Sequence, residues 1–232
     1  KLVYEDADML VIDKPAGLVV HPGAGNTDGT LANAILYHFP ELAALPRAGL
    51  VHRIDKGTTG LLVVARNEYA RNKLIRALEC HAVSRRYLAV VDGVPISGGT
   101  LDQPIGRHPH NRLRMAVNPN GKRAVTHYRV EEKFRAHALV SVELETGRTH
   151  QIRVHLSKAG YPLVGDSLYG GRLRIPAGVS GQFAETLRRF KRQALHARSL
   201  ALTHPRTDEP LNWKRPVPPD FLQLLSALRS EK

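Results

Sequence analysis

The stretch HRIDKGTTGLLVVARNEYARNKLIRALE, residues 52–79, contains a glycine-rich loop, an apolar run and a helical pattern in direct succession. The apolar run TGLLVVA, residues 59–65, is continuous and rich in branched side chains, which indicates a strand buried on both faces. Asn67 can cap the helix that follows. Apolar side chains then recur at helical spacing in Leu74, Ile75 and Leu78. The loop that holds Asp55 is therefore expected to lead directly into a core strand.

Patterns of strands and helices are mixed along the rest of the chain. Strands are expected around residues 2–4, 9–12, 87–94, 112–117, 124–134, 138–146 and 195–205. Helices are expected after the capping residue Thr30 and over residues 150–160, 183–192 and 220–229. Because strands and helices do not alternate as regular βαβ units, we predict an α+β fold. We expect a mixed, largely antiparallel sheet flanked by helices, with residues 1–232 as one domain around a central cleft.

The charge of the chain indicates a polyanionic partner. Its 232 residues include 34 Lys and Arg against 21 Asp and Glu, a formal net charge of +13. Nucleic acid is the first candidate. A membrane is a weaker candidate, because there is no cationic amphipathic tail and no apolar run of about 18 residues. Cys80 is the single cysteine, which excludes an internal disulfide and a thiolate zinc cluster and fits a reducing cytoplasm.

Cofactor and metal motifs are missing from the sequence. The loop GTTG lacks the lysine of a phosphate-binding P-loop. Among the 12 histidines there is no HExxH motif, and His150 and His155 are five residues apart, off the spacing that places two ligands on one helical face. We therefore expect no metal. A pair of histidines that cleaves RNA by acid–base chemistry, without a metal, stays open as an alternative.

Asp55 allows a structural and a functional interpretation. Aspartates before Gly-Thr loops often accept backbone N–H bonds and only set the turn. The second cationic segment, TGRTHQIRVH at residues 146–155, favours a reactive role. There Arg148 and Arg153 flank a predicted strand-to-helix turn, and a bidentate arginine is a natural partner for a carboxylate that stays charged when buried.

The motifs HRIDKGTTG, RRYLAVVDG and LETGRTHQIRVH together resemble those of the RNA pseudouridine synthases, a large bacterial family that acts on ribosomal and transfer RNA. The resemblance covers almost the whole chain, from VIDKPAGLVVHPG through VGDSLYGG and LHARSL. It implies the pseudouridine synthase fold and the isomerisation of uridine to pseudouridine. No atoms are gained or lost in that reaction, so no redox cofactor, activated donor or metal is needed.

The resemblance also implies roles for single residues. Asp55 matches the essential aspartate, which could act as a nucleophile or as a base. Tyr87 matches the tyrosine that stacks on the target base, and Arg153 matches the arginine that pairs with the aspartate. Arg53 matches the side chain that fills the gap left by the flipped nucleotide. The further candidates for RNA contacts are Lys56, Arg85, Arg107, Arg112, Arg114 and Arg148. Gly57 departs from the family pattern, in which an acidic residue is common.

The implied substrate is large-subunit ribosomal RNA in the bacterial cytoplasm, in the stem-loop at the contact with the small subunit. By the same resemblance, a small RNA-binding domain is expected upstream of Lys1. A non-catalytic RNA-binding protein is the rival interpretation. It would need phosphate contacts but not the combination of Asp55, Tyr87 and Arg153.

Overall fold

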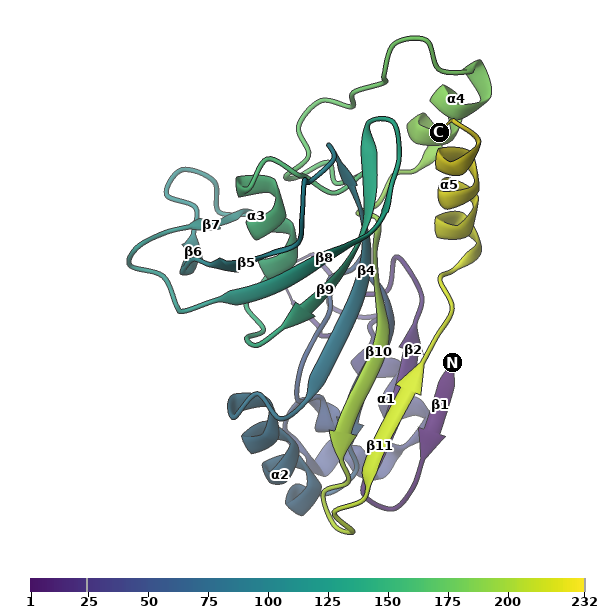
Figure 1. Cartoon of the computed structure of the whole chain (residues 1–232). Coiled ribbons are helices and arrows are strands. Elements are labelled where there is room, and N and C mark those ends of the chain that lie inside the picture. Colours follow the sequence, from purple (N-terminus) through teal and green to yellow (C-terminus); the bar gives the residue numbers. More distant parts are fainter. Residues whose placement is uncertain (24, 232) are drawn as a thin grey trace. The chain divides into compact units, whose positions relative to one another are not determined.

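The computed structural model describes residues 1–23 and 25–231, which fold into two compact units (Figure 1). Unit 1 consists of Lys1–Arg85 and Ala197–Arg215, and unit 2 of Arg86–His196 and Pro216–Lys232. Both units are thus built from two separate segments of the chain. The division falls inside the strands β4 and β10, so each of these strands contributes residues to both units.

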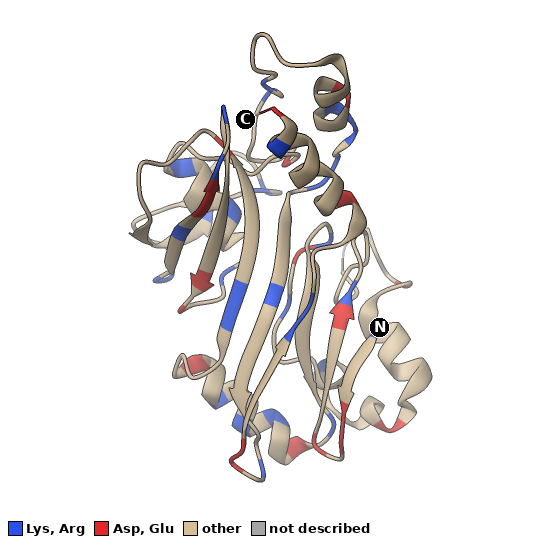
Figure 2. Ribbon diagram, turned by 45° about the vertical axis from the view of Figure 1, so that its right-hand side comes forward, with Lys and Arg blue, Asp and Glu red and all other residues tan. Residues whose placement is uncertain are grey.

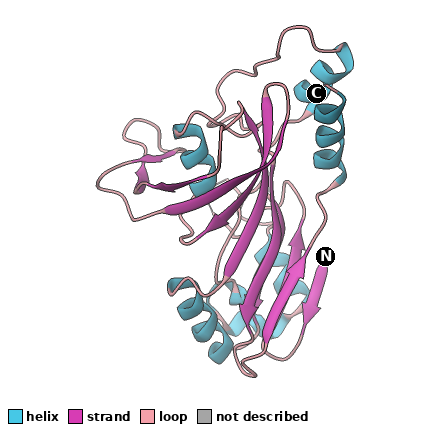
Figure 3. Cartoon of the chain, viewed as in Figure 1, coloured by secondary structure: helices cyan, strands magenta, loops and turns pink. Residues whose placement is uncertain are grey.

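The described residues form both helices and strands, and the predicted α+β class is confirmed (Figure 3). The elements of unit 1 are β1 (Leu2–Glu5), β2 (Met9–Lys14), α1 (Leu31–His38), β3 (Thr59–Ala65), α2 (Glu68–Glu79), most of β10 (Leu195–Thr203) and β11 (Pro210–Lys214), with short 3-10 turns at Pro40–Ala44 and Pro46–Gly49. Those of unit 2 are most of β4 (Ser84–Asp92), β5 (Gly99–Asp102), β6 (Ile105–Arg107), β7 (Met115–Val117), β8 (Val125–Lys133), β9 (His137–Leu144), α3 (Gln151–Lys158), α4 (Gly181–Arg189) and α5 (Pro219–Ser230).

The sheet of unit 1 has the order β1-β2-β3-β10-β11. Strand β3 is buried along its whole length, as the run TGLLVVA predicts. It pairs antiparallel with β2, which places Lys14 opposite Gly60. Helix α2 packs on this sheet through an apolar cluster that includes Met9, Val11, Leu61, Val63, Ala70, Leu74, Leu200 and Leu202. Because β3 lies in this core, the loop before it has a rigid base.

The two helices of unit 1 begin where the sequence predicts. The Thr30 hydroxyl accepts the backbone N–H of Asn33, and the Asn33 side chain accepts the N–H of Thr30, which makes a reciprocal capping box. The Asn67 side chain accepts the N–H of Ala70 at the start of α2. Each cap satisfies backbone donors that a helix terminus leaves unpaired.

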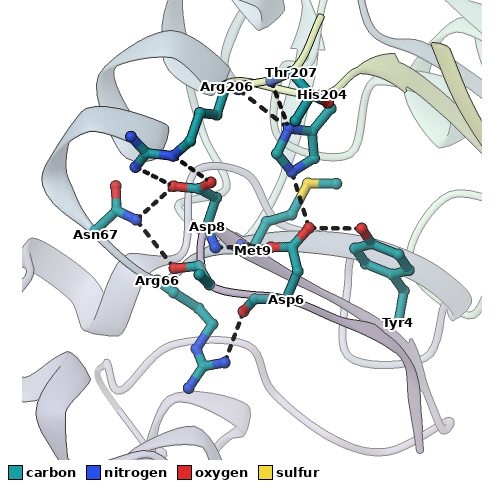
Figure 4. Close-up of polar contacts among 10 residues, drawn as sticks. Tyr4, Asp6, Asp8, Met9, Arg66, Asn67, His204, Arg206 and Thr207 are labelled. Atoms are coloured by element: carbon teal, nitrogen blue, oxygen red, sulfur yellow. Dashed lines mark hydrogen bonds and ion pairs between the residues drawn. The ribbon is translucent and has the colours of Figure 1, made fainter. Parts of the chain in front are cut away.

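A polar cluster joins the turn between β1 and β2 to the turn after β10 (Figure 4). Asp6 accepts the Tyr4 hydroxyl at 2.6 Å and lies 2.9 Å from Nε2 of His204. The hydrogen bond with Asp6 raises the pKa of Tyr4 to about 12. Asp8 forms a bidentate ion pair with Arg206 at 2.6 and 2.7 Å, which lowers the pKa of Asp8 to about 2. Asp6, Asp8 and His204 are of metal-ligand type, but their oxygens and nitrogens are engaged in these contacts, so the cluster serves to hold the two turns together.

The sheet of unit 2 has the order β4-β9-β8-β5, and all of these neighbours pair antiparallel. Helices α4 and α5 contact one another and form a core with β4 and β9. This core includes Leu88, Val90, Leu139, Phe183, Leu187, Phe221, Leu224 and Leu228. Strands β6 and β7 form a separate two-stranded hairpin, in which Arg107 lies opposite Met115.

Several boundaries differ from the predicted ones. Strand β4 begins at Ser84, three residues before the predicted start at Tyr87. The predicted strand at 112–117 is reduced to Met115–Val117, because the chain turns at Asn111–Arg114 through a backbone hydrogen bond. The short strands β5, β6 and β11 were not expected. Their neighbours in the sheets supply the pairing that a short local pattern does not signal.

Candidate active site

Asp55 lies in unit 1 on a tight loop directly before β3. Its backbone carbonyl accepts the N–H of Thr58 at 3.0 Å. Ile54 and Thr58 are buried on either side, whereas Asp55 is half-buried and both Arg53 and Lys56 are exposed. The loop is therefore anchored in the core by its apolar and threonine side chains, with its charged side chains directed outward or only partly covered.

Lys14 anchors this loop, and it is not among the predicted site residues. Its side chain is 0% exposed, and its ammonium donates to the carbonyls of Pro15 (2.9 Å), Leu18 (2.8 Å) and Lys56 (3.1 Å). The Lys56 carbonyl also accepts the N–H of Gly17 at 2.9 Å. A buried ammonium needs such partners, because desolvation without them is costly. Lys14 thus ties the Pro15–Leu18 turn to the residue that follows Asp55.

Gly60 closes the loop at a position where no other residue fits. Its φ angle is +107°, and a Cβ atom there would lie 2.2 Å from the carbonyl oxygen of Ala197 in β10. At the other end of the motif, Nε2 of His52 accepts the N–H of Val63 at 3.0 Å. Burial lowers the pKa of His52 to about 3, so this ring is neutral and acts as an acceptor. The motif HRIDKGTTG is therefore held to β3 by His52 and lies against β10 at Gly60.

Arg153 lies in unit 2, in the first turn of α3, and is buried. Its Nε and Nη2 atoms donate to the two carboxylate oxygens of Asp166 at 2.7 and 2.9 Å. The side chains of this pair are 9% and 1% exposed. Asp166 lies in the motif VGDSLYGG and is not among the predicted site residues. The predicted pairing of Arg153 with Asp55 stays a prediction, while Asp166 is its observed bidentate partner.

The start of α3 is fixed by a buried amide. The Gln151 side chain accepts the Thr146 hydroxyl at 2.8 Å and the N–H of Arg148 at 2.9 Å, and it donates to the carbonyl of Val125 at 2.9 Å. His150 before it adopts a left-handed conformation with φ at 58°. The predicted strand-to-helix turn is present. It fixes the start of α3 and therefore the position from which the Arg153 side chain extends to Asp166.

His150 and His155, whose spacing does not suit a metal site, each have hydrogen-bond partners in unit 2. His150 Nδ1 lies 2.7 Å from the Tyr169 hydroxyl. His155 is buried, with Nδ1 2.8 Å from the Thr126 hydroxyl and Nε2 2.9 Å from the carbonyl of Gln103. Burial lowers the pKa of His155, which favours its neutral form. Each of these two rings therefore has a hydrogen-bond partner within unit 2.

Tyr87 is buried on β4, opposite Val142 of β9 in unit 2. Arg85 is also buried, with 7% exposed, which sets it apart from the predicted exposed RNA contacts. The other candidates at the surface are Arg53, Lys56, Arg107, Arg112 and Arg148, and Arg114 is half-buried. Figure 2 shows that Lys and Arg are distributed over strands and helices, with Asp and Glu among them. Within the described residues, no helix is long and apolar enough to cross a membrane.

Comparisons with known proteins identify the family of the chain. The sequence model of the family described as RNA pseudouridylate synthase matches residues 8–158. The chain is 61% identical to the ribosomal large subunit pseudouridine synthase D of Pseudomonas aeruginosa over 232 residues, covering 100% of this chain and 72% of that protein. It is 57% identical to the enzyme of the same name from Xanthomonas campestris, covering 99% of this chain and 70% of that protein.

Solved structures give the same result at lower identity. The human RNA pseudouridylate synthase domain containing 4 is 29% identical, with a TM-score of 0.76, covering 98% of this chain and 92% of that one. The human domain containing 1 is 28% identical, with a TM-score of 0.71, covering 99% and 94%. From its motifs, its α+β fold and these matches, the chain belongs to the RNA pseudouridine synthase family, whose members are isomerases that act on RNA.

Proposed function

We propose that this chain converts specific uridines of large-subunit ribosomal RNA to pseudouridine, with Asp55 as the essential catalytic aspartate. The observation that carries the proposal is the 61% identity, over all 232 residues, to an enzyme named for the large ribosomal subunit. The excess of 34 Lys and Arg over 21 Asp and Glu supports an RNA substrate. We further propose that the target lies in the stem-loop at the contact with the small subunit.

The reaction breaks the bond between the ribose C1′ and the ring N1, turns the freed uracil, and forms a bond from C1′ to C5. The hydrogen at C5 leaves as a proton, and N1 gains one, so atoms and charges balance. The target uridine must first leave its helix, at a cost of a few kcal/mol. Arg53 is exposed next to Asp55 and is the side chain that we propose fills the resulting gap.

The anchored loop suits Asp55 for a reactive role. As a nucleophile it would attack C1′, and as a base it would take a proton from the ribose; both roles require the ionised carboxylate and a fixed position. Lys14 and Gly60 restrict the backbone on the two sides of the loop. The Tyr87 ring would hold the detached base by stacking, which contributes about 1–3 kcal/mol per base.

The test is Asp55→Asn, which keeps a carbonyl acceptor and removes the charge and the nucleophile. The variant should fold and bind ribosomal RNA but form no pseudouridine, as measured by tritium release from C5 of labelled uridine. Asp208→Asn is the matched control, because Asp208 is exposed and its φ of 58° suits asparagine. Tritium release by folded Asp55→Asn at the level of the control would contradict the role of Asp55.

A further inference from the structure

The hairpin β6–β7 carries three arginines in two different environments. Arg107 and Arg112 are exposed, whereas Arg114 is half-buried. The guanidinium carbon of Arg114 lies 5.2 Å from the centre of the Tyr169 ring. Its Nε is buried and has no hydrogen-bond partner among the described residues. Arg114 therefore contacts the interior of unit 2, and its charge is stabilised by an aromatic face.

Tyr169 connects the hairpin to the start of α3. Its hydroxyl accepts the backbone N–H of Met115 at 2.8 Å and lies 2.7 Å from Nδ1 of His150. The guanidinium carbon of Arg153 lies 4.9 Å from the centre of the same ring. The ring is therefore in contact with two guanidinium groups, one from the hairpin and one from the predicted active-site arginine. Apolar contacts support the arrangement through Ile105, Ala124, Val154 and Tyr169, with Met115 and Val117 packed against them.

Asp166 sets the position of both partners. One carboxylate oxygen accepts the N–H groups of Leu168 and Tyr169 at 3.0 and 3.1 Å, and this carboxylate also binds Arg153. The Asp166 backbone carbonyl accepts the N–H of Gly170 at 2.7 Å. The turn after Asp166 thus fixes the backbone of Tyr169 and the edge of the Arg153 guanidinium through one buried side chain.

We propose that RNA binds the hairpin β6–β7 through the exposed Arg107 and Arg112, and that Arg114, Tyr169 and Asp166 are positioning residues that couple the docking of this hairpin to the orientation of Arg153. The inference rests on the proposed function and adds to it a regulation of the same site by its RNA. The Asp166 carboxylate binds Nε and Nη2 along one edge of the Arg153 guanidinium. The guanidinium also lies over the Tyr169 ring. The hairpin holds Tyr169 in place through the Met115 N–H and the Arg114 guanidinium.

The coupling depends on two positions of the hairpin, one docked against Tyr169 and one displaced from it. RNA that contacts Arg107 and Arg112 together with other residues of unit 2 would bind the docked hairpin more tightly than a displaced one, and it would therefore favour the docked position. A docked hairpin maintains both contacts to Tyr169, and Tyr169 then maintains the stacked Arg153. An RNA that binds elsewhere on the protein leaves the hairpin without this additional stabilisation. Turnover therefore depends on RNA being seated on the hairpin as well as on the presence of a uridine.

The experiment compares Arg114→Met with Arg112→Met, which remove the same charge from the same hairpin. Filter binding gives the affinity for ribosomal RNA, and single-turnover tritium release at saturating protein gives the rate within the complex. Arg112→Met should weaken binding and reduce the salt dependence by about one phosphate contact, and it should lower the saturated rate less than Arg114→Met does, because Arg107 still holds RNA on the hairpin and the contacts to Tyr169 remain. Arg114→Met should change the affinity and its salt dependence less, because the Arg114 guanidinium lies over the Tyr169 ring, and it should lower the saturated rate by about 3- to 30-fold.

Tyr169→Phe tests the hydroxyl alone, since the ring over Arg153 remains. It should keep the affinity and lower the saturated rate by about 3- to 10-fold. In the double variant with Arg114→Met, the loss should be no larger than the greater single loss, because both changes interrupt one link.

The proposal is overturned if Arg114→Met has the same saturated rate as Arg112→Met, or if folded Tyr169→Phe retains the wild-type rate. If thermal melting shows that Tyr169→Phe does not fold, the two arginine variants decide alone. A failure of the proposed function would give a different result in the same assays. A wild-type protein that binds ribosomal RNA and releases no tritium would refute that function, whereas wild-type release with unaltered variants would refute only the coupling.

Discussion

Replacing Asp166 with asparagine should destabilise unit 2 far more than the same change at an exposed ion pair. Asp166 and Arg153 form a bidentate pair whose side chains are 1% and 9% exposed. Removing one partner of a buried pair costs about 3–5 kcal/mol, because the other charge remains desolvated. Asparagine keeps one carbonyl oxygen for the backbone N–H groups, so we expect the lower end, about 3 kcal/mol.

The matched control is Asp220→Asn in the same unit. Asp220 binds Arg192 in the same bidentate manner at 2.6 and 2.9 Å, but its side chain is 48% exposed. Exposed pairs contribute at most about 1 kcal/mol. The predicted difference between the two variants is therefore about 2 kcal/mol, although both lose one carboxylate charge.

Urea denaturation measures this difference. A loss of about 3 kcal/mol should lower the urea midpoint by at least about 1 M. Far-UV circular dichroism follows both units, and the fluorescence of Trp213, the single tryptophan, follows unit 1. A shift seen by circular dichroism alone would place the damage in unit 2. Equal midpoints for Asp166→Asn and Asp220→Asn would refute the assignment of a buried, stabilising contact to Asp166.

Three further predictions concern the Asp55 loop and the candidate site. Gly60→Ala should destabilise unit 1 by about 3 kcal/mol or more, and clearly more than Gly160→Ala, where φ is also positive but nothing lies within 4 Å of the added Cβ; urea midpoints compare the two. Because burial lowers the pKa of His52 to about 3, below the usual 6.5, wild-type stability should fall as the pH falls from about 6.5 towards 3. His52→Gln should lose less stability between pH 7 and pH 4, and equal losses would exclude this ring as a source. Arg153→Met and Tyr87→Ala should each lower single-turnover tritium release more than RNA affinity, and a variant that folds and turns over at the wild-type rate would remove that residue from the site.

Local signals predicted several elements of both units well. The apolar run of β3, the caps Thr30 and Asn67, and the helix over residues 151–158 each depend on side chains close in sequence. The short strands β5, β6 and β11 have 4, 3 and 5 residues, and so short a local pattern does not specify their pairing with β8, β7 and β10. The same limit applies to Asp166, because its partner Arg153 is 13 residues away and meets it only through the intervening turn.

The burial of Arg85 was not predicted, although the strand pattern indicates it. Residues two apart in a strand face the same side, so a buried Tyr87 in β4 places Arg85 on the buried face and Arg86 on the other. The structure has this alternation, with Arg85 buried and Arg86 exposed. The burial of Lys14 was harder to predict, because it depends on three carbonyls, one of them from Lys56, 42 residues further along.

The dependence of unit 1 on β10 has a consequence for synthesis of the protein. β10 is the neighbour of β3 in the sheet, and it reaches the loop of Asp55 where Gly60 meets the Ala197 carbonyl. A nascent chain that has emerged only as far as α2 leaves this edge of β3 unpaired, although every residue of the HRIDKGTTG motif is already present. Chains fold from the N-terminus as they are made, so unit 1 must wait for more than a hundred further residues, on the order of 5–20 seconds at typical elongation rates. The loop of the catalytic candidate is thus completed late in translation, which keeps a truncated chain from presenting a finished Asp55 loop to RNA.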